Sequence, residues 1–211
     1  MKAYQDASLA PVRRAKALLE EMTLAEKIGQ LNQRLYGFRI YERKCVNGED
    51  TIELSEEFCQ EVEKYSGLGV LYGLYRADPW ADKNYETGLT GVLSKKAYNQ
   101  VQRYVLEHSR LGIPVMMSSE CPHGHQALDG YLLPVNLLAG ATFDPAMVRA
   151  AYRVSGRQLQ NMGVDLALMS MLDVLRDPRW GRSEECYSED PYLSARMAEA
   201  AVIGMQESGP E

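Results

Sequence analysis

Two Asp-Pro pairs constrain the fold more than any other feature of this sequence. Asp144-Pro145 and Asp190-Pro191 each precede an amphipathic segment. Aspartate as the N-cap and proline at the first helical position are typical of a helix start, because that position needs no N–H donor. The run 164–172, which lies between the two predicted helices, is almost continuously apolar. A strand that is apolar on both faces indicates a parallel sheet covered by helices, so we expect an α/β fold.

Residues 67–211 repeat this alternation of strand and helix. The apolar patterns predict strands at 69–72, 113–117 and 164–172, and helices at 94–110, 145–162 and 191–206. In such folds the functional side chains collect just after the strands, at their carboxyl ends. Two polar segments, 118–125 and 173–190, occupy these places. We therefore expect them to face the same rim of the sheet.

Residues 1–66 have a different pattern, which predicts an extension of helices and one hairpin packed on that domain. Thr23 and Glu26 form a capping box, the signature of a helix N-terminus, inside a longer helical pattern. Asn47-Gly48 lies between apolar residues and predicts the turn of the hairpin.

Composition and charge exclude several classes of partner. The chain has a formal net charge of −6 and no long basic run, which argues against nucleic acid because phosphate binding needs a basic face. No apolar stretch approaches the length of a membrane span, and the first residues lack the apolar core of a signal peptide. The four cysteines contain no Cys-x-x-Cys pair, as expected for reduced thiols. We therefore expect a cytoplasmic protein with no membrane or nucleic-acid partner.

The segment 173–190 carries a dense mixture of charges around Trp180. Arginine donates hydrogen bonds to hydroxyl oxygens, carboxylates accept them from hydroxyls, and an indole face covers apolar C–H surface. This combination suits a polyhydroxylated ligand. The alternative is a salt-bridged loop that only anchors the strand to the following helix, and both roles can hold together.

The segment 118–125, Ser-Ser-Glu-Cys-Pro-His-Gly-His, leaves several roles open. Glu120 could bind a hydroxyl, take a proton or cap a loop. His123 and His125 alone lack the third ligand of a catalytic zinc site, so we expect no metal and assign them hydrogen bonds that shape the loop. Cys121 as a nucleophile would need a base such as His123 beside it. The sequence contains no glycine-rich phosphate loop, and we expect no cofactor.

Six motifs follow one another along almost the whole chain. They read MTLAEKIGQL at 22–31, SRLGIPV at 109–115, Glu120 ahead of His123-Gly124, GATFDP at 140–145, DPRWGR at 177–182 and SEDPYL at 188–193. In this order and combination, the chain closely resembles the N-terminal domain of glycoside hydrolase family 3. The DPRWGR and EDPYL pair is the most distinctive part of the resemblance.

The resemblance implies a fold, an activity and a binding site. The fold is a (β/α)8 TIM-type barrel, of which this chain holds the first βα units. The parent activity is that of a retaining, exo-acting β-glycosidase that hydrolyses terminal β-D-glucosyl or β-D-xylosyl residues. Arg182 is implied to bind hydroxyls of the terminal sugar, and Glu120 to grip the far edge of that sugar. His123 belongs to the family's His-Gly turn, and Trp180 and Asp173 complete the expected substrate-binding residues.

Glu120 departs from most glucosidases that the chain resembles, which have aspartate at the matching position, whereas many xylosidases have glutamate there. The longer side chain would crowd the hydroxymethyl group of a hexose. Glu120 therefore favours a pentose as the terminal sugar, while the sequence alone determines neither the sugar nor the linkage.

The catalytic residues that the resemblance implies are not among these 211 residues. Retaining hydrolysis needs two carboxyl groups flanking the bond, and the resemblance gives neither Glu120 nor Asp173 that task. A Lys-His pair and the aspartate nucleophile are expected downstream of Glu211. We therefore expect a fragment that is inactive alone, binds an oligosaccharide or β-glycoside, and forms a homo-oligomer through open barrel edges. The alternative is a non-catalytic sugar-binding or assembly module.

Overall fold

The computed structural model describes residues 2–169 and 172–207. Its α-helices are α1 (Pro11–Glu21), α2 (Leu24–Gln30), α3 (Glu56–Tyr65), α4 (Gly91–Glu107), α5 (Asn136–Gly140), α6 (Pro145–Asn161) and α7 (Pro191–Gln206). Its strands are β1 (Tyr41–Val46), β2 (Glu49–Leu54), β3 (Val70–Tyr72), β4 (Met116–Cys121) and β5 (Leu166–Met169). Short 3-10 turns cover Ala3–Gln5, Gly37–Arg39, Pro178–Trp180 and Ser183–Glu185. Within the described ranges, no helix combines the length and the apolarity needed to cross a membrane.

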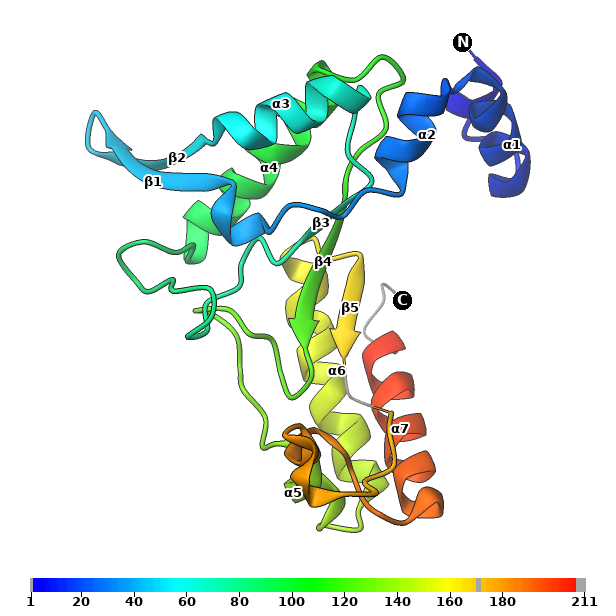
Figure 1. Cartoon of the computed structure of the whole chain (residues 1–211), viewed down its shortest axis with the longest axis vertical. Coiled ribbons are helices and arrows are strands. Elements are labelled where there is room, and N and C mark those ends of the chain that lie inside the picture. The colour runs from blue at the N-terminus through cyan, green and yellow to red at the C-terminus, as the bar shows by residue number, and fades with distance from the viewer. Residues whose placement is uncertain (1, 170–171, 208–211) are drawn as a thin grey trace.

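Three strands form a parallel sheet in the order β3-β4-β5, and the α/β fold expected from the sequence is confirmed. α4 connects β3 to β4 and α6 connects β4 to β5, as in the βα units of a barrel. Figure 1 shows β4 beside β5, with α6 behind them and α7 next to α6. The described residues thus form part of a (β/α)8-type barrel, with β5 at one edge of their sheet.

The hairpin and α3 pack against α4. β1 and β2 pair antiparallel, and Asn47 and Gly48 adopt the left-handed conformation that the predicted tight turn requires. Residues from the hairpin, α3 and α4 share one apolar cluster, which includes Ile52, Phe58 and Val101. The hairpin is therefore confirmed, and a domain boundary at residue 66 stays a prediction.

The alternation of side chains along the strands decides which residues can reach a ligand. Met117 and Cys121 of β4 are buried on the face that α4 and α6 cover. Met116 and Glu120 lie on the opposite face, because successive side chains of a strand alternate. Leu166 of β5 pairs with Ser118 and shares this second face; Leu166 and Met116 are 42% and 45% exposed. One face of the sheet is packed, and the other is partly open.

The predicted helix starts are confirmed by their caps. Asp144 and Asp190 each accept a hydrogen bond from a backbone N–H of the first turn, at 3.0 and 2.9 Å. In α2, the Thr23 N–H donates to Glu26 Oε2 at 2.8 Å, and the Glu26 N–H donates to Thr23 Oγ1 at 3.3 Å. These bonds satisfy donors for which a helix has no internal partner.

The predicted strand 113–117 is wrong in its bounds. β4 begins at Met116, whose N–H donates to the Gly69 carbonyl at 3.0 Å, and it continues to Cys121. The chain ahead of it cannot join the ladder, because Gly112 has a φ of +62° and Pro114 has no N–H to donate. Residues 118–121 of the polar segment that was expected after the strand therefore lie within it, and residues 122–125 follow it.

Two further boundaries differ from the predictions. The helix predicted at 94–110 is α4, which begins earlier, at Gly91, where Asp129 Oδ2 accepts the backbone N–H at 2.6 Å. The strand predicted at 164–172 is the shorter β5; just ahead of it the Asp165 N–H donates to the Met117 carbonyl at 2.9 Å, while the Met117 N–H donates to the Asp165 carboxylate at 2.8 Å. Residues 170 and 171 of that prediction lie outside the described residues. The short helix α5 was not predicted.

Candidate functional site

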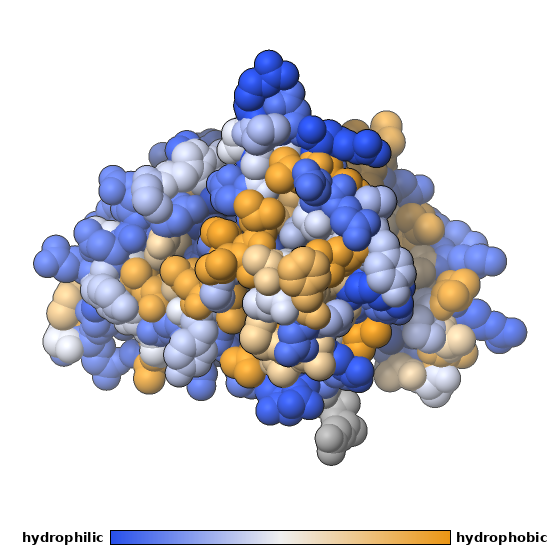
Figure 2. Space-filling view, turned by 90° about the horizontal axis from the view of Figure 1, so that it is seen from below, coloured by the Kyte–Doolittle hydropathy of each residue, from blue (hydrophilic) through white to orange (hydrophobic). Residues whose placement is uncertain are grey.

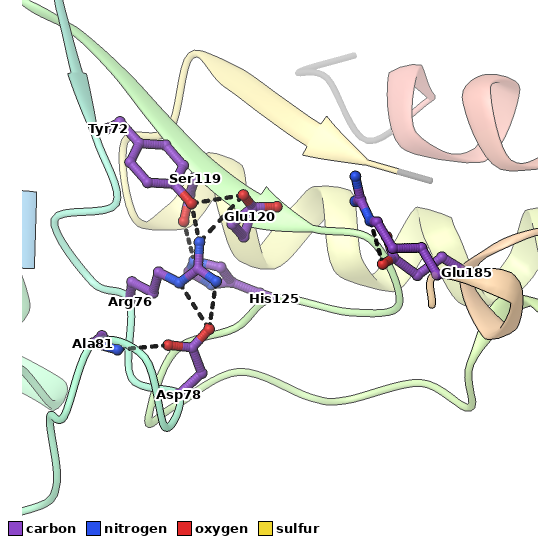
Figure 3. Close-up of polar contacts among 9 residues, drawn as sticks. Tyr72, Arg76, Asp78, Ala81, Ser119, Glu120, His125 and Glu185 are labelled. Atoms are coloured by element: carbon purple, nitrogen blue, oxygen red, sulfur yellow. Dashed lines mark hydrogen bonds and ion pairs between the residues drawn. The ribbon is translucent and has the colours of Figure 1, made fainter. Parts of the chain in front are cut away.

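Glu120 is the centre of a group of polar contacts at the end toward which β3 and β4 run (Figure 3). Tyr72 ends β3 and pairs with Ser118 of β4, so Glu120 lies two residues further along, on the same face. The Tyr72 hydroxyl donates to Glu120 Oε1 at 2.6 Å. Arg76 Nη1 donates to the same oxygen at 3.3 Å, and Arg76 also donates to the Tyr72 hydroxyl. Parallel pairing thus brings together side chains that are distant in the sequence.

Arg76 is held in turn by Asp78. Arg76 Nε donates to Asp78 Oδ2 at 2.8 Å, and Arg76 Nη2 lies 2.5 Å from the same oxygen. Asp78 Oδ1 accepts the Ala81 N–H at 2.9 Å. Burial alone would raise the pKa of Asp78, but the bonds from Arg76 and Ala81 outweigh burial and lower that pKa below its ordinary value. Asp78 is therefore an ionised anchor for Arg76.

The Glu120 carboxyl has a different electrostatic balance. Its side chain is 25% exposed, and burial raises the pKa of Glu120 above the ordinary value. The positive charges of Arg76 and Arg182 oppose this rise, whereas the negative charges of Asp78 and Glu185 add to it. A carboxyl group with a perturbed pKa at the carboxyl end of a parallel strand is a candidate functional group.

Aromatic rings form one side of this site. The Arg76 guanidinium lies 4.5 Å from the centroid of the Trp80 ring. Tyr36 and Phe38 meet Trp80 edge-on, each with 5.0 Å between ring centroids. Trp80 and Tyr36 are exposed, so their rings offer apolar surface next to the polar group.

The His-Gly turn after β4 is shaped by a buried histidine. His125 is fully buried, and its Nε2 lies 2.9 Å from Ser119 Oγ. Burial lowers the pKa of His125 to about 4, so the ring is neutral at pH 7. The predicted loop-shaping role of His125 is confirmed. His123 Nδ1 is buried without a hydrogen-bond partner in the described part of the chain, where no group of three or more His, Cys, Asp or Glu side chains could hold a metal ion.

Arg182, the second arginine of the DPRWGR motif, lies across from Glu120. It donates to the two carboxylate oxygens of Glu185 from Nε and Nη2, both at 2.6 Å. Figure 3 shows Glu185 on the far side of Glu120 from Tyr72. The charge of Arg182 lowers the pKa of Glu120, and the charge of Glu120 helps to raise the pKa of Arg182. Arg182 and Glu185 of the second predicted polar segment therefore lie near Glu120 of the first.

The remaining predicted residues of this segment lie around a separate hollow. Asp173 and Trp180, both exposed, line an open cavity of about 450 Å3, together with Val174, Arg176, Asp177 and Arg179. None of these lining residues belongs to the group that contacts Glu120. The Arg179 side chain pairs with Asp177 at 2.6 Å and is 88% exposed.

Comparison with known proteins identifies the family. Residues 23–209 match the family model described as the glycosyl hydrolase family 3 N terminal domain. The chain belongs to glycoside hydrolase family 3. A periplasmic β-glucosidase of Salmonella typhimurium is 30% identical over 193 residues, which are 92% of this chain and 20% of that protein. A β-xylosidase of Formosa agariphila is 32% identical over 141 residues, 64% of this chain and 20% of that protein.

A solved structure agrees with the family 3 assignment. The β-glucosidase structure from Erythrobacter marinus superposes with a TM-score of 0.74 at 29% identity, covering 100% of this chain and 25% of that chain. The resemblance stated from the six motifs and the barrel fold are thus confirmed. This chain spans about a fifth to a quarter of the length of the relatives it matches.

Several residues of this family 3 site were not predicted from the sequence. Tyr72, Arg76 and Trp80 belong to the group around Glu120, yet they were assigned no role. A signal for them exists. The stretch 76–80, Arg-Ala-Asp-Pro-Trp, begins four residues after the predicted strand 69–72 and combines arginine, aspartate and tryptophan, as the DPRWGR motif does. The rule that places sites at the carboxyl ends of strands therefore applied to it as well.

Proposed function

We propose that this chain supplies sugar-gripping residues of a retaining, exo-acting β-glycosidase that removes terminal β-D-glucosyl or β-D-xylosyl residues. The observation that carries the proposal is the Glu120 carboxylate, partly buried at the end of the central strand with Oε1 held by Tyr72 and Arg76. The names of the relatives, β-glucosidase and β-xylosidase, support this class of substrate.

In the proposed binding mode, the sugar hydroxyls contact both an acceptor and a donor group. Glu120 accepts hydrogen bonds from hydroxyls of the terminal sugar, and Arg182 donates to hydroxyl oxygens from the opposite side. Trp180 and Asp173 offer a second binding surface in the separate hollow that they line, and His123 supports the loop after β4. Retaining hydrolysis needs two reacting carboxyl groups about 5–5.5 Å apart, and we assign them to residues outside this sequence. The chain alone is therefore expected to leave aryl β-glucosides and β-xylosides intact.

The length of Glu120 supports a preference for xylosyl over glucosyl residues. Glutamate reaches further than aspartate and would crowd the hydroxymethyl group that a hexose carries and a pentose lacks. Discrimination of one small group by a pocket amounts to about 1–3 kcal/mol. The substitution E120D is expected to shift the ratio of the Kd values for D-xylose and D-glucose toward glucose, and an unchanged ratio would remove Glu120 from the specificity.

An NMR titration of the isotope-labelled chain with D-xylose and D-glucose tests the proposed function. Sugar-dependent shifts are expected for residues around Glu120 in the wild-type chain, and weaker binding in E120Q. The matched control is E49Q, which changes an exposed glutamate of the hairpin. Absence of binding by the wild-type chain, or equal affinity in E120Q, would refute the role of Glu120. Turnover by the purified chain that E120Q abolishes would refute the assignment of catalysis to other residues.

We also propose a cytoplasmic location and self-association. The described cysteines are free thiols, and Cys45 is exposed, which suits a reducing compartment. Fractionation of the source cells tests the location, and recovery with the periplasm or the medium would contradict it.

The proposed self-association rests on the edge of the sheet. β5 is at the sheet edge, and Figure 2 shows apolar residues gathered in the middle of the face seen from below. A free strand edge and exposed apolar surface each favour association between two copies.

A further inference from the structure

One oxygen of Glu120 receives two donors, and no described residue donates to the other oxygen, which is left for a ligand. Tyr72 and Arg76 both donate to Oε1, at 2.6 and 3.3 Å. Figure 3 shows the second carboxylate oxygen pointing away from Tyr72 and Arg76, toward the side where Glu185 lies. We propose that Arg76 is a positioning residue for sugar binding: with Tyr72 it holds Oε1 of Glu120 so that Oε2 is presented to a sugar hydroxyl. This inference rests on the proposed role of Glu120 in gripping the sugar.

The surroundings of Arg76 keep its guanidinium in one place. Asp78 binds it through Nε and Nη2, and the exposed ring of Trp80 lies against it at 4.5 Å. The backbone is fixed as well, because the Ala77 N–H donates to the Gln126 carbonyl at 3.2 Å. The Arg76 side chain is 14% exposed. Each of its contacts removes rotamer freedom before any ligand arrives.

Such an arrangement strengthens binding by lowering its entropic cost. A flexible glutamate loses rotamer freedom when it binds a ligand, and this loss opposes binding. Glu120 is already fixed through Oε1, so this loss occurs during folding instead. A charged hydrogen bond that the oriented carboxylate accepts from a hydroxyl then adds its full strength. The second face of β4 thus offers a prepared acceptor rather than a mobile one.

The charges around Glu120 make the effect of Arg76 measurable by titration. The groups that face its carboxyl are Arg76 and Asp78 after β3, the Tyr72 hydroxyl on β3, and Arg182 and Glu185 beyond the strand ends. Burial raises the pKa of Glu120, and Arg76 is the strongest of the groups that oppose the rise. Replacing Arg76 by a neutral side chain is therefore expected to raise that pKa further.

The experiment compares R76M and R76K with the wild-type chain, using R43M as the matched control. Arg43 also pairs with an aspartate, Asp50, at 2.6 Å and is 22% exposed, but it lies on the hairpin. Two quantities are measured: the pKa of Glu120 by carbon-13 NMR of its carboxyl group, assigned with E120Q, and the Kd for D-xylose by titration.

The expected results separate positioning from charge alone. R76M should raise the pKa of Glu120 and weaken D-xylose binding about tenfold, a loss typical of one hydrogen bond to a charged group. R76K keeps the positive charge but lacks the planar guanidinium. The pKa of Glu120 should therefore be close to the wild-type value in R76K, while the affinity for D-xylose should stay close to that of R76M. R43M should match the wild-type chain in both quantities.

Other outcomes overturn the inference. Wild-type affinity in R76M would show that Arg76 does not position Glu120 for the sugar, and full affinity in R76K would reduce its role to charge. If R76M does not fold, Y72F decides. It removes the other donor to Oε1, together with the hydroxyl to which Arg76 donates, and should also weaken binding. Unchanged binding in Y72F would refute the proposal that Tyr72 and Arg76 together hold Glu120. Failure of the wild-type chain to bind D-xylose would refute the proposed function, while the pKa comparison of R76M with R43M would still decide whether Arg76 holds Glu120.

Discussion

The hydroxyl of Tyr72 donates a 2.6 Å hydrogen bond to Oε1 of Glu120 across the β3–β4 pair. The two residues are 48 positions apart in the sequence, and only the parallel register brings them together. A register shift of one residue would turn Glu120 to the face that α4 and α6 cover. The polar group at the rim therefore depends on the packing of Met117 and Cys121 on the other face of β4, which fixes the register.

The two arginines of the DPRWGR motif are expected to differ in function. R182M should weaken D-xylose binding by about tenfold, because it removes a charged donor opposite Glu120. R179M is the comparison: the Arg179 side chain is 88% exposed and, among the described residues, pairs with the neighbouring Asp177, so R179M should change binding and the thermal midpoint much less than R182M does. NMR titration and thermal unfolding monitored by circular dichroism measure both effects. A larger loss of binding in R179M would exchange the two roles.

Gly124 and Gly181 offer a matched test of the His-Gly turn. Both have a φ near +90°, where a side chain is strained. An added Cβ at Gly124 would collide with the backbone of Tyr131 and Leu132, whereas at Gly181 it would meet nothing within 4 Å. G181A should therefore lower the free energy of unfolding by about 1 kcal/mol. G124A should lower it by roughly 3 kcal/mol or more. Urea unfolding of the two variants measures the difference, and equal losses would mean that the turn relaxes without cost.

Glu26 is expected to make the stability of the chain depend on acid pH. Hydrogen bonds from Arg110 at 2.9 and 2.7 Å, which outweigh burial and act with the bonds from Thr23, lower the pKa of Glu26 from 4.5 to about 2. A lowered folded-state pKa contributes stability that is complete above 4.5 and is lost as the pH falls through about 2. E26Q keeps a side-chain acceptor for the capping box but lacks the charge, so it should be less stable than the wild type at pH 7.

The pH series provides its own control for this prediction. The difference in thermal midpoint between the wild-type chain and E26Q should shrink between pH 4.5 and 2 and vanish below that range. Circular dichroism melts at several pH values measure it. A difference that stays constant from pH 7 to 2 would show that packing of the Gln side chain, and not the charge of Glu26, causes the loss.

Local features of the fold could be predicted from the sequence because their causes are local. The caps at Asp144 and Asp190 and the turn at Asn47-Gly48 depend on hydrogen bonds and backbone angles within a few residues. The bounds of β4 could not be predicted in this way. Ser119 is polar, yet it is buried within the strand because His125 pairs with it from the following loop, and no local pattern reveals such a partner.

The candidate site was predictable only in part for the same reason. Glu120 and Arg182 stand in motifs, so the resemblance pointed to them. Arg76 becomes part of the site through its contacts with Tyr72 and Glu120. These contacts form only when β3 and β4 pair. In the sequence, the nearby Asp78 predicts only a surface ion pair with Arg76. Tertiary pairing, and not residue type, makes this arginine part of the site.

The exposed edge strand β5 leads to the prediction that the chain self-associates. In the described residues β5 pairs only with β4, which leaves its other side free to bind a strand of a second copy. Leu166 faces the open side of the sheet and is 42% exposed, so pairing would also cover apolar surface. A two-fold dimer is expected, because one self-complementary edge then meets its copy.

A charge on this edge should abolish the dimer. L166K places a lysine on the open face of β5, where burying an ammonium group against a second copy is unfavourable. V12K is the matched control, since Val12 is an exposed apolar residue of α1, away from the sheet. Light scattering after size-exclusion chromatography at micromolar to high micromolar concentrations should give a dimer for the wild-type chain and V12K, and a monomer for L166K. A monomeric, folded wild-type chain over the whole range would show that β5 does not pair between copies, and a dimer that persists in L166K would place the interface on another surface.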